Sequence, residues 1–139
     1  MKHVLVMLLM LVALPAQAQE RPHFSVHNNS LMAITSPRPG EMVIVYSRPR
    51  PDLYGLVQPG TLLVRGMWQG QTFAGTAFVF SSLCGAIPYP VNGTVDGSGA
   101  LMLLGPAPQF DIYCNILGFA IGSQHAVLRF EPVKEGVLK

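Results

Sequence analysis

Proline and glycine are spread so densely through this chain that long helices have almost nowhere to form. The 139 residues include 14 glycines and 12 prolines, and after residue 18 only one sizeable stretch, His23 to Ser36, is free of both. Within a helix, glycine costs about 1 kcal/mol and proline about 3 kcal/mol relative to alanine. The other apolar runs are cut to the length of strands. The sequence therefore predicts an all-β fold.

The hydrophobic patterns inside these runs also favour strands. Residues 89–96 alternate between apolar and polar side chains, and residues 126–131 do so less cleanly. Four further runs are apolar on both faces, which suggests central strands packed on each side. These runs are residues 42–47, 62–68, 72–80 and 100–104. Gly66, Gly75 and Gly93 fall inside runs, where glycine usually marks a bulge or a sharp bend. We expect a single antiparallel meander barrel or a compact β-sandwich of six to eight strands, with one disulfide.

The two cysteines, Cys84 and Cys114, are predicted to form that disulfide. Two tight hairpin turns and two longer connections alternate along the chain, and in a meander alternate connections lie at opposite ends of the sheet. The tight turns are residues 69–70 and 96–99, and the longer connections are residues 81–88 and 105–110. Cys84 lies in the first longer connection and Cys114 just after the second, so both come to the same end. A bond closing about 30 residues should stabilise the fold by roughly 3–4 kcal/mol. The alternative, a redox-active pair, usually has two residues between its cysteines at a helix N-terminus.

The first 18 residues have the pattern of a bacterial signal peptide. Lys2 precedes an eleven-residue apolar run, and Ala16-Gln17-Ala18 is the small-x-small pattern of a cleavage site. The run is too short for the roughly 20 residues that span a bilayer. No later segment approaches that length without a proline, glycine or polar residue, so we expect no membrane span in the mature chain. A buried or interfacial helix is the alternative. The expected organisation is a signal peptide at 1–18, an N-terminal extended segment at 19–40, a β-domain at 41–133 and a C-terminal tail at 134–139. The predicted location is the periplasm or the exterior of the cell.

Charge argues against a nucleic-acid partner. Residues 19–139 carry eight Lys and Arg and seven Asp and Glu, which gives a net charge of +1. Nucleic-acid binding needs a clustered basic face. The only local cluster, Arg38, Arg48 and Arg50, lies among prolines and is interpreted as a solvated loop.

Catalytic and metal-binding patterns are weak. His23 and His27 are four residues apart without a nearby cysteine or carboxylate, so no metal and no cofactor are expected. Gly97-Ser98-Gly99 lacks the spacing of a nucleophile elbow and is interpreted as a turn. The carboxylates that could pair for glycoside hydrolysis are scattered. They are Glu41, Asp52, Asp96 and Asp111. We expect no catalytic residues and a protein that is not an enzyme.

Aromatic and proline residues around the two longer connections suggest a binding face. Prolines stiffen both connections, and rigid side chains lose little entropy on binding. The candidate binding residues are Ile87, Tyr89, Phe110 and Tyr113. The alternative is that these side chains cap the open end of the core.

Residues 54–130 resemble a set of small, leader-bearing hypothetical proteins of alphaproteobacteria. The shared motifs are Gly75-Thr76-Ala77-Phe78-Val79-Phe80, Cys84-Gly85, Tyr89-x-Val91-x-Gly93, Gly105-x-Ala107-Pro108 and Cys114. The resemblance implies an exported β-domain and no particular activity. Periplasmic inhibitors of C-type lysozyme carry Ser-Gly-x-x-Tyr in their functional loop, whereas Ser98-Gly99 here is followed by Met102 at the tyrosine position.

The functional hypothesis is an exported, non-enzymatic binding or structural module. Its partner would be a protein or a component of the cell envelope. The alternative is a periplasmic inhibitor of a cell-wall hydrolase or, with less support, a hydrolase acting on the cell wall.

Overall fold

The computed structural model describes residues 20–134, which contain ten strands, one short 3₁₀ turn and no α-helix. The predicted signal peptide and all but the first residue of the predicted tail lie outside the described residues. The elements are β1 His23–His27, β2 Ser30–Thr35, β3 Glu41–Arg48, η1 Pro51–Leu53, β4 Leu62–Gln69, β5 Thr72–Ser81, β6 Gly85–Val95, β7 Leu101–Leu104, β8 Ala107–Phe110, β9 Ile116–Ala120 and β10 Val127–Pro132. The all-β prediction is confirmed.

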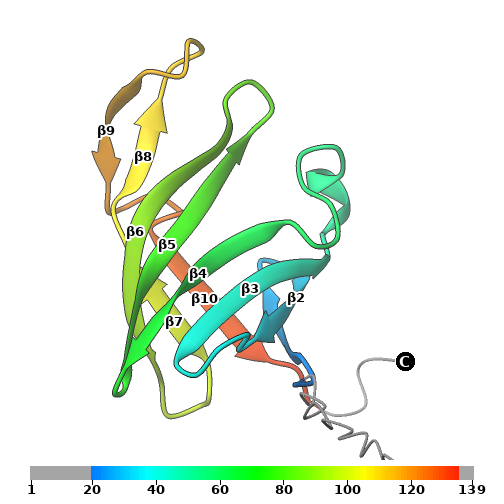
Figure 1. Ribbon diagram of the computed structural model, residues 1–139. Helices are drawn as coiled ribbons and strands as arrows, with labels where there is room; N and C mark the ends of the chain where they lie inside the picture. The colour runs from blue at the N-terminus through cyan, green and yellow to red at the C-terminus, as the bar shows by residue number, and fades with distance from the viewer. Residues whose placement is uncertain (1–19, 135–139) are drawn as a thin grey trace, which may run out of the picture.

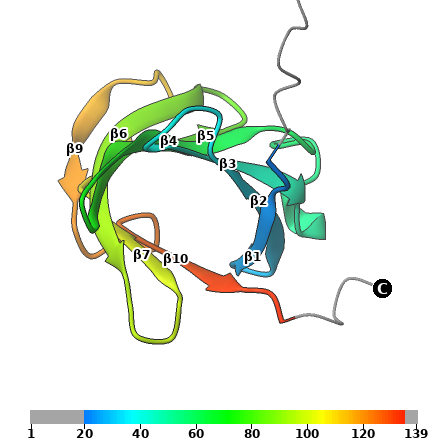
Figure 2. The same ribbon diagram turned by 60° about the horizontal axis from the view of Figure 1, so that its bottom comes forward.

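Eight of the strands form one closed antiparallel barrel. The order around the barrel is β1-β10-β7-β6-β5-β4-β3-β2, and β1 closes the ring by pairing Ser25 with Pro132 and Val26 with Glu131. Figure 2 looks into the barrel and shows a single layer of strands around the core. Closure leaves no barrel strand with an unpaired edge. Of the two architectures expected from the sequence, the barrel is the one observed.

The alternation of connections along the meander is also confirmed. The β4–β5 and β6–β7 turns lie at the lower end in Figure 1, and the β5–β6 connection and the β8–β9 turn lie at the upper end. The second longer connection differs from the prediction, because residues 107–110 form strand β8. This strand and β9 make a separate two-stranded sheet between β7 and β10 in the chain.

The N-terminal segment is part of the barrel. Residues 19–40 were expected to form an extended segment before the β-domain, but β1 and β2 supply two of the eight barrel strands. Asn28 and Asn29 connect them with φ angles of 45° and 62°. Two consecutive residues with positive φ make the turn that matches the right-handed twist of a hairpin, and asparagine tolerates this conformation. The β-domain therefore begins at His23 rather than at residue 41.

Interior glycines allow neighbouring strands to approach closely. Gly66 on β4 lies directly opposite Gly75 on β5. A Cβ atom on Gly66 would overlap the backbone of β5, and one on Gly93 would overlap the carbonyl of Met102 on β7. The register shifts lie instead in the β2–β3, β3–β4 and β8–β9 pairings. These glycines thus mark close backbone contacts, and of the two expected roles the bulge is wrong for them.

The core fills the inside of the barrel. Each barrel strand except β1 contributes buried apolar side chains, such as Ile44, Phe73 and Phe130, whereas β1 contributes Ser25 and His27. The outward side chains Met67 and Leu104 are about half exposed. The expectation that both faces are covered is therefore wrong for β4 and β7, whereas on β3 the consecutive residues Met42, Val43 and Ile44 are all buried.

Candidate functional site

The β8–β9 hairpin stands outside the barrel wall. Figure 1 shows β8 between β9 and β6, and both views show β9 at the periphery (Figures 1 and 2). Ala107 and Phe110 of β8 pack toward the core, which anchors this strand to the barrel. In contrast, β9 pairs with β8 alone among residues 20–134.

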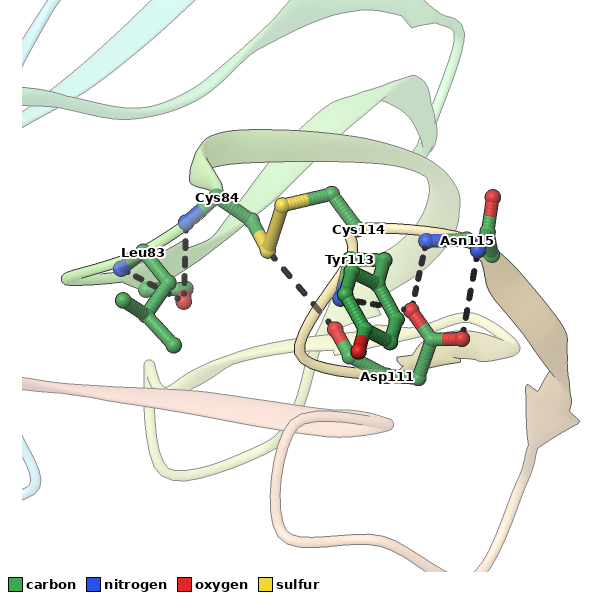
Figure 3. Close-up of a disulfide and its surroundings, with 7 residues drawn as sticks. Leu83, Cys84, Asp111, Tyr113, Cys114 and Asn115 are labelled. Atoms are coloured by element: carbon green, nitrogen blue, oxygen red, sulfur yellow. Dashed lines mark hydrogen bonds between the residues drawn. A yellow bond between two sulfur atoms is a disulfide. The ribbon is translucent and has the colours of Figure 1, made fainter.

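A disulfide fixes the tip of this hairpin to the barrel. Cys84 and Cys114 are bonded with their Cα atoms 5.4 Å apart, within the usual range for a disulfide, so this prediction is confirmed. The bond joins the β5–β6 connection to the β8–β9 turn (Figure 3). The hydroxyl of Ser81 accepts hydrogen bonds from the backbone N–H groups of Leu83 and Cys84, at 3.2 Å each. Both connections at this end are thereby held in place.

Asp111 shapes the β8–β9 turn. Its Oδ1 accepts hydrogen bonds from the backbone N–H groups of Tyr113 and Asn115, each at 2.9 Å (Figure 3). The Asp111 carbonyl accepts the N–H of Cys114, which has a φ of 65°. The hydrogen bond from the Asn115 backbone is the largest cause that lowers the pKa of Asp111. The Asp111 carboxylate accepts hydrogen bonds that a backbone carbonyl accepts in an ordinary turn. Tyr113 therefore lies in a turn of well-defined conformation.

Large apolar side chains cover this hairpin and are exposed. Each has between 52% and 83% of its surface exposed, although apolar side chains normally gain about 1.5–3 kcal/mol from burial. We call this set the hairpin patch; it consists of Leu83, Ile112, Tyr113, Ile116, Leu117, Phe119 and Ile121. Large contiguous apolar patches on a protein surface usually mark interaction sites.

The four candidate binding residues have different environments. Tyr113 is 77% exposed and belongs to the hairpin patch, whereas Ile87 and Phe110 are partly buried. Tyr89 is only 2% exposed, and its hydroxyl donates a hydrogen bond to the His125 carbonyl. Burial raises the pKa of Tyr89 to about 12. Tyr89 is therefore a core residue, and it cannot lie on a surface that touches a partner.

Sequence reasoning missed most of the hairpin patch. Leu117, Phe119 and Ile121 belong to a stretch, residues 112–128, that contains no Asp, Glu, Lys or Arg. Apolar residues in an uncharged stretch of this length are usually buried, so the sequence alone predicts that these side chains are buried. Its exposure follows from the position of β9 outside the barrel, which local sequence does not reveal.

A small cavity of about 80 Å³ lies at the barrel end that carries η1. Two of the polar residues at this cavity, His27 and Arg50, are bonded to the protein itself. His27 donates from Nδ1 to the Arg129 carbonyl at 2.9 Å and accepts at Nε2 from Asn28, and burial lowers its pKa. Nη1 of Arg50 donates to the Asn28 carbonyl, and its Nε lies 2.9 Å from Oδ1 of Asp52, without the alignment of a hydrogen bond. Tyr46 and His125 line the same cavity, so polar groups remain available there to a ligand.

The scattered carboxylates each have a local partner. Glu41 pairs with Arg38 and Arg65, at 3.2 and 3.3 Å. Asp96 closes the β6–β7 turn, where hydrogen bonds from Ser98 lower its pKa to about 2. The serine of Gly97-Ser98-Gly99 is therefore a turn residue, as expected. Within residues 20–134 no three His, Cys, Asp or Glu side chains are grouped so that they could hold a metal ion.

No protein-family model matches this chain, and no curated protein or solved structure is significantly similar to it. None of the helical structure in residues 20–134 is long and apolar enough to cross a bilayer. The structure defines the class as a closed eight-stranded antiparallel barrel with a disulfide-fixed accessory hairpin. The functional argument depends on that hairpin.

Proposed function

We propose that this protein is an exported, non-enzymatic binding module that contacts its partner through the hairpin patch. The observation that carries the proposal is the exposure of the patch on a hairpin held by a disulfide and by Asp111. The partner is a protein or a component of the cell envelope.

Rigidity and apolar area together favour binding. Tyr113 and Leu83 come from different connections, and the disulfide holds these connections next to each other. A surface fixed before binding loses little conformational entropy when it docks. Side chains that are more than half exposed before docking then gain most of their burial free energy from the partner.

Export is supported by two features. The predicted leader at 1–18 directs a chain out of the cytoplasm, and disulfides persist mainly in oxidising compartments. The form recovered from the periplasm or the medium should begin at Gln19 and contain no free thiol, which intact-mass measurement checks directly.

The binding proposal is tested at the tip of the hairpin. The purified exported protein, labelled with a photo-crosslinker, is incubated with a cell-envelope fraction, and the crosslinked products are identified by mass spectrometry. The double variant Leu83→Ser/Tyr113→Ser should lose these products. The matched control is Met67→Ser/Leu104→Ser, which removes two half-exposed apolar side chains from the barrel wall. Undiminished crosslinking of the tip variant, or equal loss in the control, would refute the proposed surface.

A further inference from the structure

The cavity at the barrel end that carries η1 combines an apolar floor with a polar rim. Leu63, Val79 and Leu128 line it and are between 3% and 6% exposed, so they form its floor. Arg50, with 32% of its side chain exposed, and His125 lie nearer the solvent. Binding sites for small molecules are typically apolar hollows with a few well-placed polar groups, and the mouth of a β-barrel is a common place for them.

Arg50 is held in a defined position at this rim. Its backbone N–H donates to Oγ of Ser30 at 3.0 Å, and its Nη1 donates to the Asn28 carbonyl at 3.2 Å. A guanidinium carries five N–H donors in a planar fork, and this fork matches the two oxygens of a carboxylate. Because the bond to Asn28 uses one of these donors, others remain for a ligand.

The charges around the cavity favour an anion. Its ionisable lining residues are one arginine, two histidines and two tyrosines, and no Asp or Glu of residues 20–134 is among them. Burial raises the pKa of Tyr46, and the Arg50 charge opposes this rise by favouring the anionic form. The same positive field favours the ionised form of a bound carboxylate.

The nearby carboxylate of Asp52 is a weak competitor for Arg50. Its Oδ1 lies 2.9 Å from Nε of Arg50, but its side chain is 68% exposed and does not line the cavity. Ion pairs with exposed members are weak because water and salt screen them. Asp52 therefore leaves the guanidinium able to bind an anion on the side of the cavity.

The volume of the cavity limits the size of the ligand. It is about 80 Å³. One water-sized sphere takes about 10–15 Å³ of such a volume, so about six non-hydrogen atoms fit. A carboxylate group accounts for three of them and leaves room for a chain of about three carbons. The apolar floor favours a hydrocarbon chain, because a polar group buried there would lack a hydrogen-bond partner.

We propose that this cavity binds a small carboxylate with a short apolar chain, of the size of butyrate. The carboxylate lies at the rim, where Arg50 donates to it and Tyr46 and His125 supply further donors. The chain packs on the apolar floor. The cavity shares no residue with the hairpin patch, so the inference goes beyond the proposed function and is independent of it.

NMR titrations of the exported protein, with its disulfide intact, test the chemistry of the ligand. Butyrate should bind in a saturable way. Butyramide has the same size without the charge and should bind at least about tenfold more weakly, because it loses the charge-assisted hydrogen bonds. Butylammonium has the opposite charge and should not bind. Acetate lacks two CH₂ groups and should bind about tenfold more weakly than butyrate.

The methyl resonances locate the ligand in the same titration. Those of Leu63, Val79 and Leu128 should shift as butyrate is added. Those of Leu117 and Ile121 in the hairpin patch should stay in place, which provides an internal control for non-specific apolar contact.

Two variants test the rim. Arg50→Gln should raise the dissociation constant of butyrate at least about tenfold, because it removes the charge. Arg48→Gln is the matched control, since Arg48 is an exposed arginine of β3 that does not line the cavity, and it should leave the constant within about twofold. Tyr46→Phe keeps the ring and removes one donor, and it should weaken binding about fivefold. Circular dichroism shows that each variant is folded.

Four results would overturn the inference. They are the absence of saturable butyrate binding, butyramide or butylammonium binding as tightly as butyrate, an affinity unchanged by both Arg50→Gln and Tyr46→Phe, and shifts confined to the hairpin patch. The capture experiment with Leu83 and Tyr113 uses another surface and another readout, so failure of the cavity site and failure of the proposed function are distinguishable.

Discussion

Removing the disulfide should lower the free energy of unfolding by an amount that follows from the length of chain it closes. Cys84 and Cys114 are 30 residues apart in sequence. The chain-entropy relation gives about 3.7 kcal/mol at 25 °C for a loop of this length. For a domain of this size, the entropy of unfolding converts that loss to a fall of about 15 °C in Tm.

The measurement compares the wild type with Cys84→Ser/Cys114→Ser by urea denaturation and calorimetry at pH 7. Ser82→Ala, an exposed substitution in the same connection, is the control and should change stability by less than about 0.5 kcal/mol. Hydrogen exchange adds spatial detail, because the amides of β8 and β9 should lose protection before those of the barrel.

Two outcomes would refute this reasoning. A loss below about 1 kcal/mol would mean that the unfolded chain gains little freedom when the bond is absent. A loss well above about 5 kcal/mol would exceed any reasonable loop entropy. In that case the disulfide would stabilise the barrel mainly by keeping the hairpin packed against it through Ala107 and Phe110, rather than by restricting the unfolded chain.

Two further predictions concern the barrel itself. Gly66→Ala should cost about 3 kcal/mol or prevent folding, because the added methyl meets the β5 backbone, whereas Gly97→Ala should change urea stability by under about 0.5 kcal/mol. Burial lowers the pKa of His27, so the unfolded chain binds a proton that the folded protein excludes. Stability should therefore be fully present above pH 6.5 and fall as the pH decreases through the folded pKa. The measurement is the free energy of unfolding from urea titrations at several pH values. His27→Gln should reduce its dependence on pH, and the part that remains is due to His125, whose pKa burial also lowers. An unchanged pH dependence would mean that groups other than His27 cause it.

Local features of the sequence were enough to predict the fold class and the disulfide. Proline and glycine act on the few residues around them, so their exclusion of helices holds whatever the tertiary structure. The tight turns at Gln69–Gly70 and Asp96–Gly99 set the direction of the strands that they join. Because directions alternate from one turn to the next, the ends that carry Cys84 and Cys114 followed from counting connections.

Features that depend on distant pairing were not predictable in the same way. β1 belongs to the barrel because Ser25 and Val26 pair with β10, more than 100 residues away in the chain. The Asn28-Asn29 turn was a local signal for a hairpin at this position, but the hairpin joins the barrel only through closure. Tyr89 shows a related limit: alternation placed it on an apolar face without revealing that this face lies inside the barrel.

The hairpin patch is the clearest example of a feature that local sequence does not predict. Its sequence indicates that the side chains are buried, whereas its position outside the barrel leaves them exposed. The barrel pairs every one of its own edges, so a strand excluded from the ring must leave an edge open or find cover elsewhere. Ala107 and Phe110 attach one strand of the hairpin to the core, and the disulfide fixes its turn. These constraints hold β9 away from the barrel while keeping it ordered. Burial of Leu117 and Phe119 then requires another molecule, and the same bond that stabilises the fold keeps the hairpin patch in position to meet it.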